Sequence, residues 1–381
     1  MTTAYLWLHF ALTMWSLAQA TMAAHVFYNV FTIQATIPFD FSKPNAAMPF
    51  SDYISTSVKI QSDSGAISGS YTPIIDTGSC GFVISAADLS DWTQDDASGH
   101  PEGWEFLSSS KILYTGHWIP KDIYFTNAKV EVKARIPILA VETKTHCPTY
   151  NRTADNGLCP TPASAIPMPT GIRLMGVGFG REHDGMPQGT PDKNAFINIQ
   201  TINGVNVTGN PNFRSGFILS KDGVTVGLTA ENTAGMDFTK LAMREEPADA
   251  RDWAQVEGCM SVDGSKSFTG PALIDTGISQ MYMTLPLGTK VNRTSPPVLD
   301  DGSVVEIKIG PSADGKYISS ENFTVGDTNG MDQGVVPSSV RLTLADPAKN
   351  APHFNTGRHF LRKWNIAFDS DGGYFGLART G

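Results

Sequence analysis

The chain has 381 residues, more than one hydrophobic core usually supports, so we expect two lobes of ordinary domain size. A hydrophobic share of 41% against a charged share of 17% excludes an intrinsically disordered chain. The net charge of −9 is not concentrated in any acidic or basic block, which argues against nucleic acid as a partner.

The first segment predicts a signal peptide at residues 1–20. Residues 1–39 contain no Asp, Glu, Lys or Arg, and the apolar run Leu6–Leu17 is followed by AQA, a suitable signal-peptidase site. The run is short for a bilayer span, but its lack of flanking Lys or Arg leaves a signal anchor or a buried N-terminal strand as alternatives. We expect a secreted or vacuolar protein with no stable membrane anchor.

Strand-like stretches dominate from Tyr53 onward, separated by turns rich in Gly, Asn, Asp and Ser. They include residues 54–60, 71–75, 129–141 and 217–228. Helical patterns are short, for example at 86–92 and 360–364. The sequence therefore predicts an all-β fold with a few short helices.

A weak internal repeat joins TPIIDTGSCGFVIS at 72–85 to GPALIDTGISQMYMTLP at 270–286. Each copy reads apolar strand, Asp-Thr-Gly, apolar strand, and the two copies lie about one lobe apart. We therefore expect an N-terminal lobe at 21–227 and a C-terminal lobe at 228–381, each contributing one turn to a shared cleft.

Cysteines and glycosylation sequons agree with the secretory pathway. Cys147 and Cys159 flank a short loop, and an oxidising compartment would join them. Cys80 and Cys259 could form a second bridge or remain buried thiols. The four sequons start at Asn151, Asn206, Asn292 and Asn322.

The two Asp-Thr-Gly turns carry the chemistry. A single turn of this kind is most often an ordinary β-turn, but two matched copies can bring Asp76 and Asp275 face to face. Two adjacent carboxyls cannot both ionise, so they share a proton, and the pair can act as acid and base at once. This arrangement predicts amide hydrolysis by an activated water, without a metal, another cofactor or a covalent intermediate.

The chain resembles the pepsin family of aspartic peptidases from about Tyr53 to Ala378. The resemblance rests on YISTSVKI and YTPIIDTGS in the first half, on RLMGVGFG at 173–180, and on NTGRHFLRKWNIAFDSDGGYFGLA at 355–378. It implies a bilobal acid-protease fold with two related six-stranded β lobes around a central cleft. It also implies a monomer that binds polypeptide substrate in an extended conformation.

The resemblance assigns roles to individual residues. Asp76 and Asp275 become the catalytic pair, and the following Thr77 and Thr276 interlock beneath them. Ser79 supports its aspartate with a hydroxyl. The turn residues Gly78 and Gly277 bring backbone close to the carboxyls.

The family closes a β-hairpin flap over its substrate, with a tyrosine near the tip. The segment KILYTGHWIPKDIYF at 111–125 lies where this flap is expected. We therefore predict a substrate-binding flap that contains Tyr114, Thr115 and Gly116, with Tyr114 near its tip.

Several positions depart from the family pattern. Ile278 stands where Thr or Ser usually follows the second turn, so Asp275 lacks a stabilising hydroxyl and should titrate higher. Lys43 is the single Lys or Arg in residues 21–52, so we expect this stretch to lack the basic prosegment found in zymogens of the family. Asn355-Thr356 and Arg358 also replace the usual residues of the closing segment.

Two functions follow from these observations. The first is an aspartic endopeptidase. The alternative is a pepsin-fold protein with a non-proteolytic role, such as a binding or inhibitory module or a small-molecule biosynthetic enzyme. The retained pair of aspartates favours the endopeptidase, because a pure binding module needs neither carboxylate.

Overall fold

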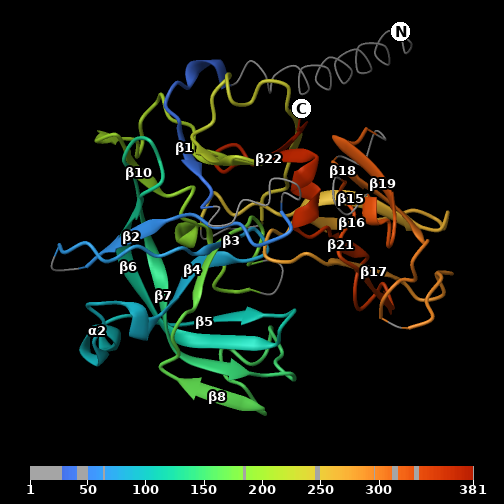
Figure 1. Ribbon diagram of the computed structural model, residues 1–381, viewed down its shortest axis with the longest axis horizontal. Helices are drawn as coiled ribbons and strands as arrows, with labels where there is room; N and C mark the ends of the chain where they lie inside the picture. The colour runs from blue at the N-terminus through green and yellow to red at the C-terminus, as the bar shows by residue number, and fades with distance from the viewer. Residues whose placement is uncertain are drawn as a thin grey trace, which may run out of the picture.

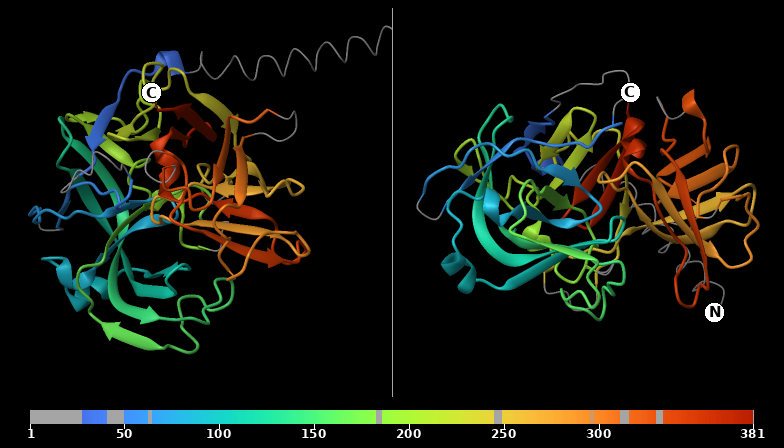
Figure 2. Two further views of the ribbon diagram at one scale, coloured as in Figure 1. Left: turned by 45° about the vertical axis from the view of Figure 1, so that its right-hand side comes forward. Right: turned by 60° about the horizontal axis from the view of Figure 1, so that its bottom comes forward.

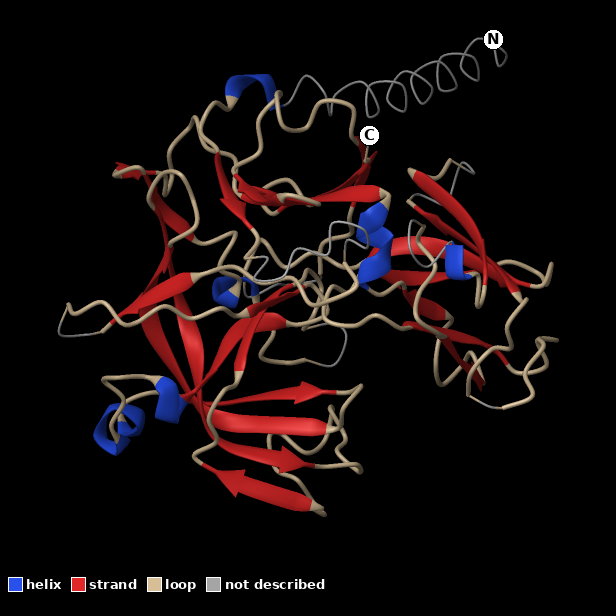
Figure 3. Cartoon of the chain, in the orientation of Figure 1, coloured by secondary structure: helices blue, strands red, loops and turns tan. Residues whose placement is uncertain are grey.

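The computed structural model describes residues 28–40, 50–62, 65–182, 186–244, 249–295, 297–310, 316–329 and 334–380. The predicted signal peptide at 1–20 lies outside the described residues. Strands dominate (Figure 3), and the helical segments are short: η1 (Tyr28–Val30), η2 (Ala86–Asp88), α2 (Gln94–Ser98), η3 (Pro191–Lys193) and η4 (Arg358–Arg362). In these described ranges no helix is long and apolar enough to cross a membrane. The predicted all-β class is confirmed.

A ten-stranded sheet occupies one side of the molecule (Figure 1). Its strands are β2 (Val58–Gln61), β3 (Ile74–Asp76), β4 (Cys80–Ser85), β5 (Glu102–Leu107), β6 (Ile112–Phe125), β7 (Val132–His146), β8 (Ser164–Pro167), β9 (Arg173–Val177), β10 (Ile199–Ile202) and β11 (Val205–Asn206). The path β11-β10-β7-β4-β9-β3 is extended by β2, β5, β6 and β8, which join through β6 and β7. The long β6 and β7 strands curl strongly (Figure 2), so this sheet forms an open half-barrel.

A seven-stranded sheet occupies the opposite side (Figure 1), in the order β19-β18-β15-β16-β21-β17-β20. Its strands are β15 (Val256–Val262), β16 (Phe268–Leu273), β17 (Met281–Pro286), β18 (Val304–Ile309), β19 (Ser319–Thr324), β20 (Val340–Ala345) and β21 (His353–Asn355). The sheet is also curled, and buried apolar side chains alternate with more exposed residues along β18 and β20, as on the buried face of a half-barrel.

A third sheet has six strands taken from both halves of the chain, in the order β1-β13-β12-β22-β23-β14. These are β1 (Ala35–Pro38), β12 (Gly216–Ser220), β13 (Gly223–Val226), β14 (Asp237–Lys240), β22 (Trp364–Asp369) and β23 (Tyr374–Arg379). Phe217 of β12 stacks on Phe368 of β22 with 4.9 Å between ring centroids, and Phe179 and Phe196 pack against this pair. The aromatic cluster ties the shared sheet to the ten-stranded one.

The shared sheet corrects the expectation of six strands per lobe. The lobe sheets have ten and seven strands, and the six-stranded sheet belongs to neither lobe alone. A lobe boundary after Gly227 does not divide the chain into two sets of independent sheets. The C-terminal strands β22 and β23 pair with each other, and β22 also pairs with β12, which precedes this boundary.

The sequence repeat corresponds to a repeated arrangement of strands. β9 runs parallel to β3 and antiparallel to β4, so it passes behind Asp76 as the sequence predicts. In the other lobe β21 runs parallel to β16 and antiparallel to β17. In addition, β7 pairs parallel with β4, as β20 does with β17. Each Asp-Thr-Gly turn therefore links two strands that are held together from behind by a third.

Candidate active site

Each Asp-Thr-Gly turn leaves a strand whose last residues are apolar and buried. Ile75 precedes Asp76 at the end of β3, and Ile274 precedes Asp275 just beyond β16; both isoleucines are fully or almost fully buried. Their burial fixes the strand ends, so each aspartate emerges at a defined point. The two carboxyls line one cleft of about 1770 Å³ between the curled sheets.

The glycine of each turn lies against the carboxyl of the other. A Cβ atom on Gly78 would come within 2.4 Å of the Asp275 carboxyl carbon, and one on Gly277 within 2.6 Å of Asp76 Oδ1. No side chain fits in either place. The glycines are therefore required by the close approach of the two turns, as the resemblance implies.

The two threonines interlock beneath the carboxyls. The Thr77 backbone N–H donates to Thr276 Oγ1 at 3.0 Å, and the Thr276 N–H donates to Thr77 Oγ1 at 3.1 Å. Each hydroxyl in turn donates across the interface to the carbonyl before the opposite aspartate, Ile274 or Ile75. These four bonds are buried, so they hold the turns in a fixed relative position.

Both carboxyls accept hydrogen bonds, but from different donors. Asp76 accepts from the Gly78 N–H and the Ser79 hydroxyl, each at 2.7 Å. Asp275 accepts from the Gly277 N–H at 2.8 Å and from the Asn355 side-chain amide at 2.7 Å. Ser79 thus supports its aspartate as expected.

The surroundings of Asp275 favour its protonated form. Its pKa is raised to about 8, first by burial, then by the charge of Asp76 and a hydrogen bond to that residue. The Asn355 amide and the positive charge of Arg181 act in the opposite direction. Burial, rather than the missing hydroxyl at Ile278, is the main cause of the raised pKa.

The segment 111–125, where the sequence predicts the flap hairpin, is almost entirely one strand, β6, so the hairpin begins earlier in the chain. β5 and β6 form a hairpin in which Leu107 pairs with Ile112, so its turn lies at Ser108–Lys111. The predicted flap residues Tyr114, Thr115 and Gly116 belong to this hairpin but lie in its second strand, β6, and not at its turn.

Gly116 lies at a β-bulge in β6. The register of β6 against β7 shifts between Thr115 and Gly116, and a Cβ on Gly116 would clash with the carbonyl of Ala140. Gly116 therefore serves the bulge, not a turn. Tyr114 is buried and still lines the cleft, while the turn residues Ser108 to Lys111 line it from the hairpin end.

Positive side chains outnumber negative ones along the cleft, although the whole chain carries a net charge of −9. Apart from the two catalytic candidates, the acidic lining residue is Glu257. The cationic lining residues are Lys111, Lys144, Arg152, Arg173, Arg181, Lys240 and Lys349. The described cleft is therefore suited to ligands with negative charge.

Two residues near the pair, Glu105 and Arg181, were missed by sequence reasoning, and Asn355 was noticed only as a departure from the family pattern. Glu105 on β5 is buried, its Oε1 has no hydrogen-bond partner among the described residues, and burial followed by the charge of Asp76 raises its pKa to about 8. Arg181 is buried at the cleft and counteracts the pKa increase of both Glu105 and Asp275. Glu105 stands between Trp104 and Phe106 in β5, and a carboxyl between two aromatic residues could have indicated a buried acid.

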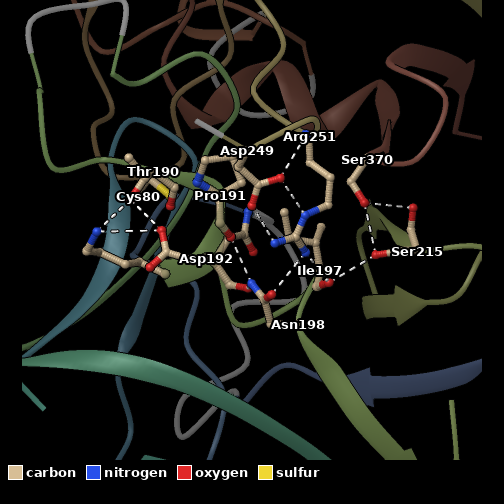
Figure 4. A network of polar contacts seen from close by, with 12 residues as sticks. Cys80, Thr190, Pro191, Asp192, Ile197, Asn198, Ser215, Asp249, Arg251 and Ser370 are labelled. Carbon is tan, nitrogen blue, oxygen red and sulfur yellow. Dashed lines mark hydrogen bonds and ion pairs between the residues drawn. The ribbon is translucent and has the colours of Figure 1, made fainter. Parts of the chain in front are cut away.

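Cys80 follows Ser79 in the sequence and is buried. Its thiol contacts the Thr190 carbonyl at 3.3 Å, and burial raises its pKa, so it is an unreactive structural thiol. Thr190 belongs to the stretch 190–198, whose far end is held by Arg251 (Figure 4). Arg251 donates to the carbonyl of Ile197 and to the side chain of Asn198. This network anchors the chain behind the first turn.

A disulfide joins Cys147 to Cys159, as predicted, while Cys80 and Cys259 are buried free thiols. The asparagines of the four sequons, Asn151, Asn206, Asn292 and Asn322, are all exposed.

No protein-family model matches this chain, and no curated protein matches it either. The resemblance to the pepsin family therefore rests on the motifs and on the geometry of the two turns.

Proposed function

We propose that this protein is an aspartic endopeptidase with a divergent pepsin-like fold. The observation that carries the proposal is the pair of interlocked turns, in which each glycine lies against the carboxyl of the opposite turn. A β-turn that only reverses the chain does not require contact between its carboxyl and a matching turn in the other half of the chain.

Asp275 holds the shared proton and Asp76 is the carboxylate. Asp76 takes a proton from a water molecule as its oxygen attacks the scissile carbonyl carbon, and Asp275 gives its proton to the carbonyl oxygen. The resulting tetrahedral diol collapses as the carbon–nitrogen bond breaks. The leaving nitrogen receives the proton from Asp76, and a diol hydroxyl returns a proton to Asp275, which restores the pair.

The substrate is a polypeptide that lies extended along the cleft. The turn of the β5–β6 hairpin at Ser108–Lys111 and residues of both curled sheets line this cleft, which supports an extended ligand spanning the two lobes. The hairpin turn covers this part of the cleft, and Tyr114 lines the cleft from the second strand of the same hairpin. The disulfide and the four exposed sequons support a secretory-pathway location.

The proposal is tested by incubating the purified protein with a denatured polypeptide from pH 3 to 7, with and without a statine-type peptide. The statine hydroxyl imitates the tetrahedral diol, so it should bind the pair and block cleavage. We expect cleavage at internal bonds that the statine peptide suppresses. A folded protein that cleaves nothing over this range would contradict the proposal and favour the non-proteolytic alternative.

A further inference from the structure

We propose that Asn355 is a positioning residue of the catalytic pair, which supplies from strand β21 the hydrogen bond that a hydroxyl at Ile278 would otherwise give to Asp275. The inference rests on the proposed function for its activity readout. Its geometry stands by itself: the Asn355 amide nitrogen lies 2.7 Å from Asp275 Oδ2.

The orientation of the Asn355 side chain is fixed by a second contact. Its carbonyl oxygen Oδ1 accepts the backbone N–H of Gly357 at 3.0 Å. With the oxygen engaged there, the NH₂ group must face Asp275 and can only donate to it. Gly357 has a φ of 67°, and a Cβ there would approach the Gln280 carbonyl to 2.6 Å, so the turn that presents its N–H requires glycine.

The strand repeat shows what Asn355 replaces. Asn355 pairs with Leu273 of β16 and Tyr282 of β17. In the other lobe, Leu174 of β9 pairs with the corresponding strands β3 and β4. Leu174 cannot donate a hydrogen bond. One carboxyl is thus supported by a hydroxyl of its own turn, the other by an amide from the strand behind it.

The charged groups that face Asp275 are Asp76 on the opposite turn, Arg181 beyond β9 and Arg358 in η4. Asp76 favours the protonated form of Asp275, while the two arginines favour the ionised form. Replacing Asn355 leaves these three charged residues in place. The effect of the replacement therefore reports the amide itself.

The key variant is Asn355→Leu, which copies the residue at the corresponding position in the other lobe. Loss of the donor removes an interaction that favours ionised Asp275, so its pKa should rise by about one unit. The alkaline limb of the kcat/KM profile should move upward by the same amount. Adding Ile278→Thr to this variant offers a new donor and should return the limb towards its wild-type position.

Leu174→Met is the matched control, because it changes packing at the corresponding position without changing a donor. The alkaline limb should not move in this control. Should Asn355→Leu fail to fold, Asn355→Ala removes the amide without adding another donor and should give the same upward shift.

A second readout does not depend on activity. The carboxyl carbons of isotopically labelled aspartates are followed by NMR titration, and the Asp275 signal is identified by its absence in Asp275→Asn. An upward shift of its pKa in Asn355→Leu, reversed in the double variant, supports the inference even if no substrate is cleaved. An unchanged titration, or an equal shift in Leu174→Met, overturns it while leaving the proposed peptidase activity untouched.

Discussion

Glu105 should make the stability of this fold depend on pH, and Glu105→Gln should remove that dependence. The side chain is only 3% exposed, and its pKa is raised from 4.5 to about 8, first by burial and then by the charge of Asp76. Because the folded-state pKa lies above the unfolded one, the contribution to stability is complete below pH 4.5 and is lost as the pH rises to 8. Between pH 5 and pH 7 this loss amounts to about 2.5 kcal/mol.

Urea unfolding followed by tryptophan fluorescence at pH 5 and pH 7 measures the effect. Gln has the shape of protonated Glu and cannot ionise, so Glu105→Gln should lose about 2.5 kcal/mol less than the wild type between the two pH values. Glu131→Gln is the matched control, because Glu131 is exposed and should behave as wild type. Equal pH-dependent losses in wild type and Glu105→Gln would refute the reasoning.

Further expectations concern the disulfide, a buried arginine and the cleft charge. Replacing Cys147 and Cys159 with serine should lower the free energy of unfolding by about 3 kcal/mol, as chain entropy predicts for a short loop, and an unchanged urea midpoint would contradict this. Arg358→Met removes one buried and one partly buried hydrogen bond to backbone carbonyls before β2 and should lower the free energy of unfolding by about 3 kcal/mol in the same assay; a loss below about 1 kcal/mol would argue against it. The cleft lysines Lys111 and Lys144 should favour acidic substrates. The measured quantity is the ratio of kcat/KM for a peptide with Glu beside the cleaved bond to kcat/KM for its Gln analogue. The double variant Lys111→Gln/Lys144→Gln should lower this ratio about threefold, and an unchanged ratio would show that these lysines do not select acidic substrates.

Local motifs allowed the centre of the site to be predicted. The Asp-Thr-Gly turns, the supporting hydroxyl of Ser79 and the pairing of Cys147 with Cys159 each depend on residues close in sequence or on a repeated motif. Their physical requirements, a tight turn or a short loop, leave a direct trace in the residue order.

Other features depend on contacts that a single sequence does not show. Asn355 reaches Asp275 only because β21 pairs with β16 and β17, and Glu105 lies near Asp76 because β5 folds onto β6. The predicted strand 217–228 is two strands, since the turn residues after Ser220 reverse the chain. The bulge at Gly116 likewise depends on the pairing of β6 with β7, which the sequence does not show.

The most direct test of the account is the kcat/KM of Asp76→Asn and Asp275→Asn for one peptide with an identified cleavage site. If the two carboxyls share one proton and activate one water, both variants should lose roughly 10³-fold or more, while the exposed control Asp222→Asn keeps wild-type activity. Substantial cleavage by either active-site variant would contradict the catalytic pair and, with it, the proposed function.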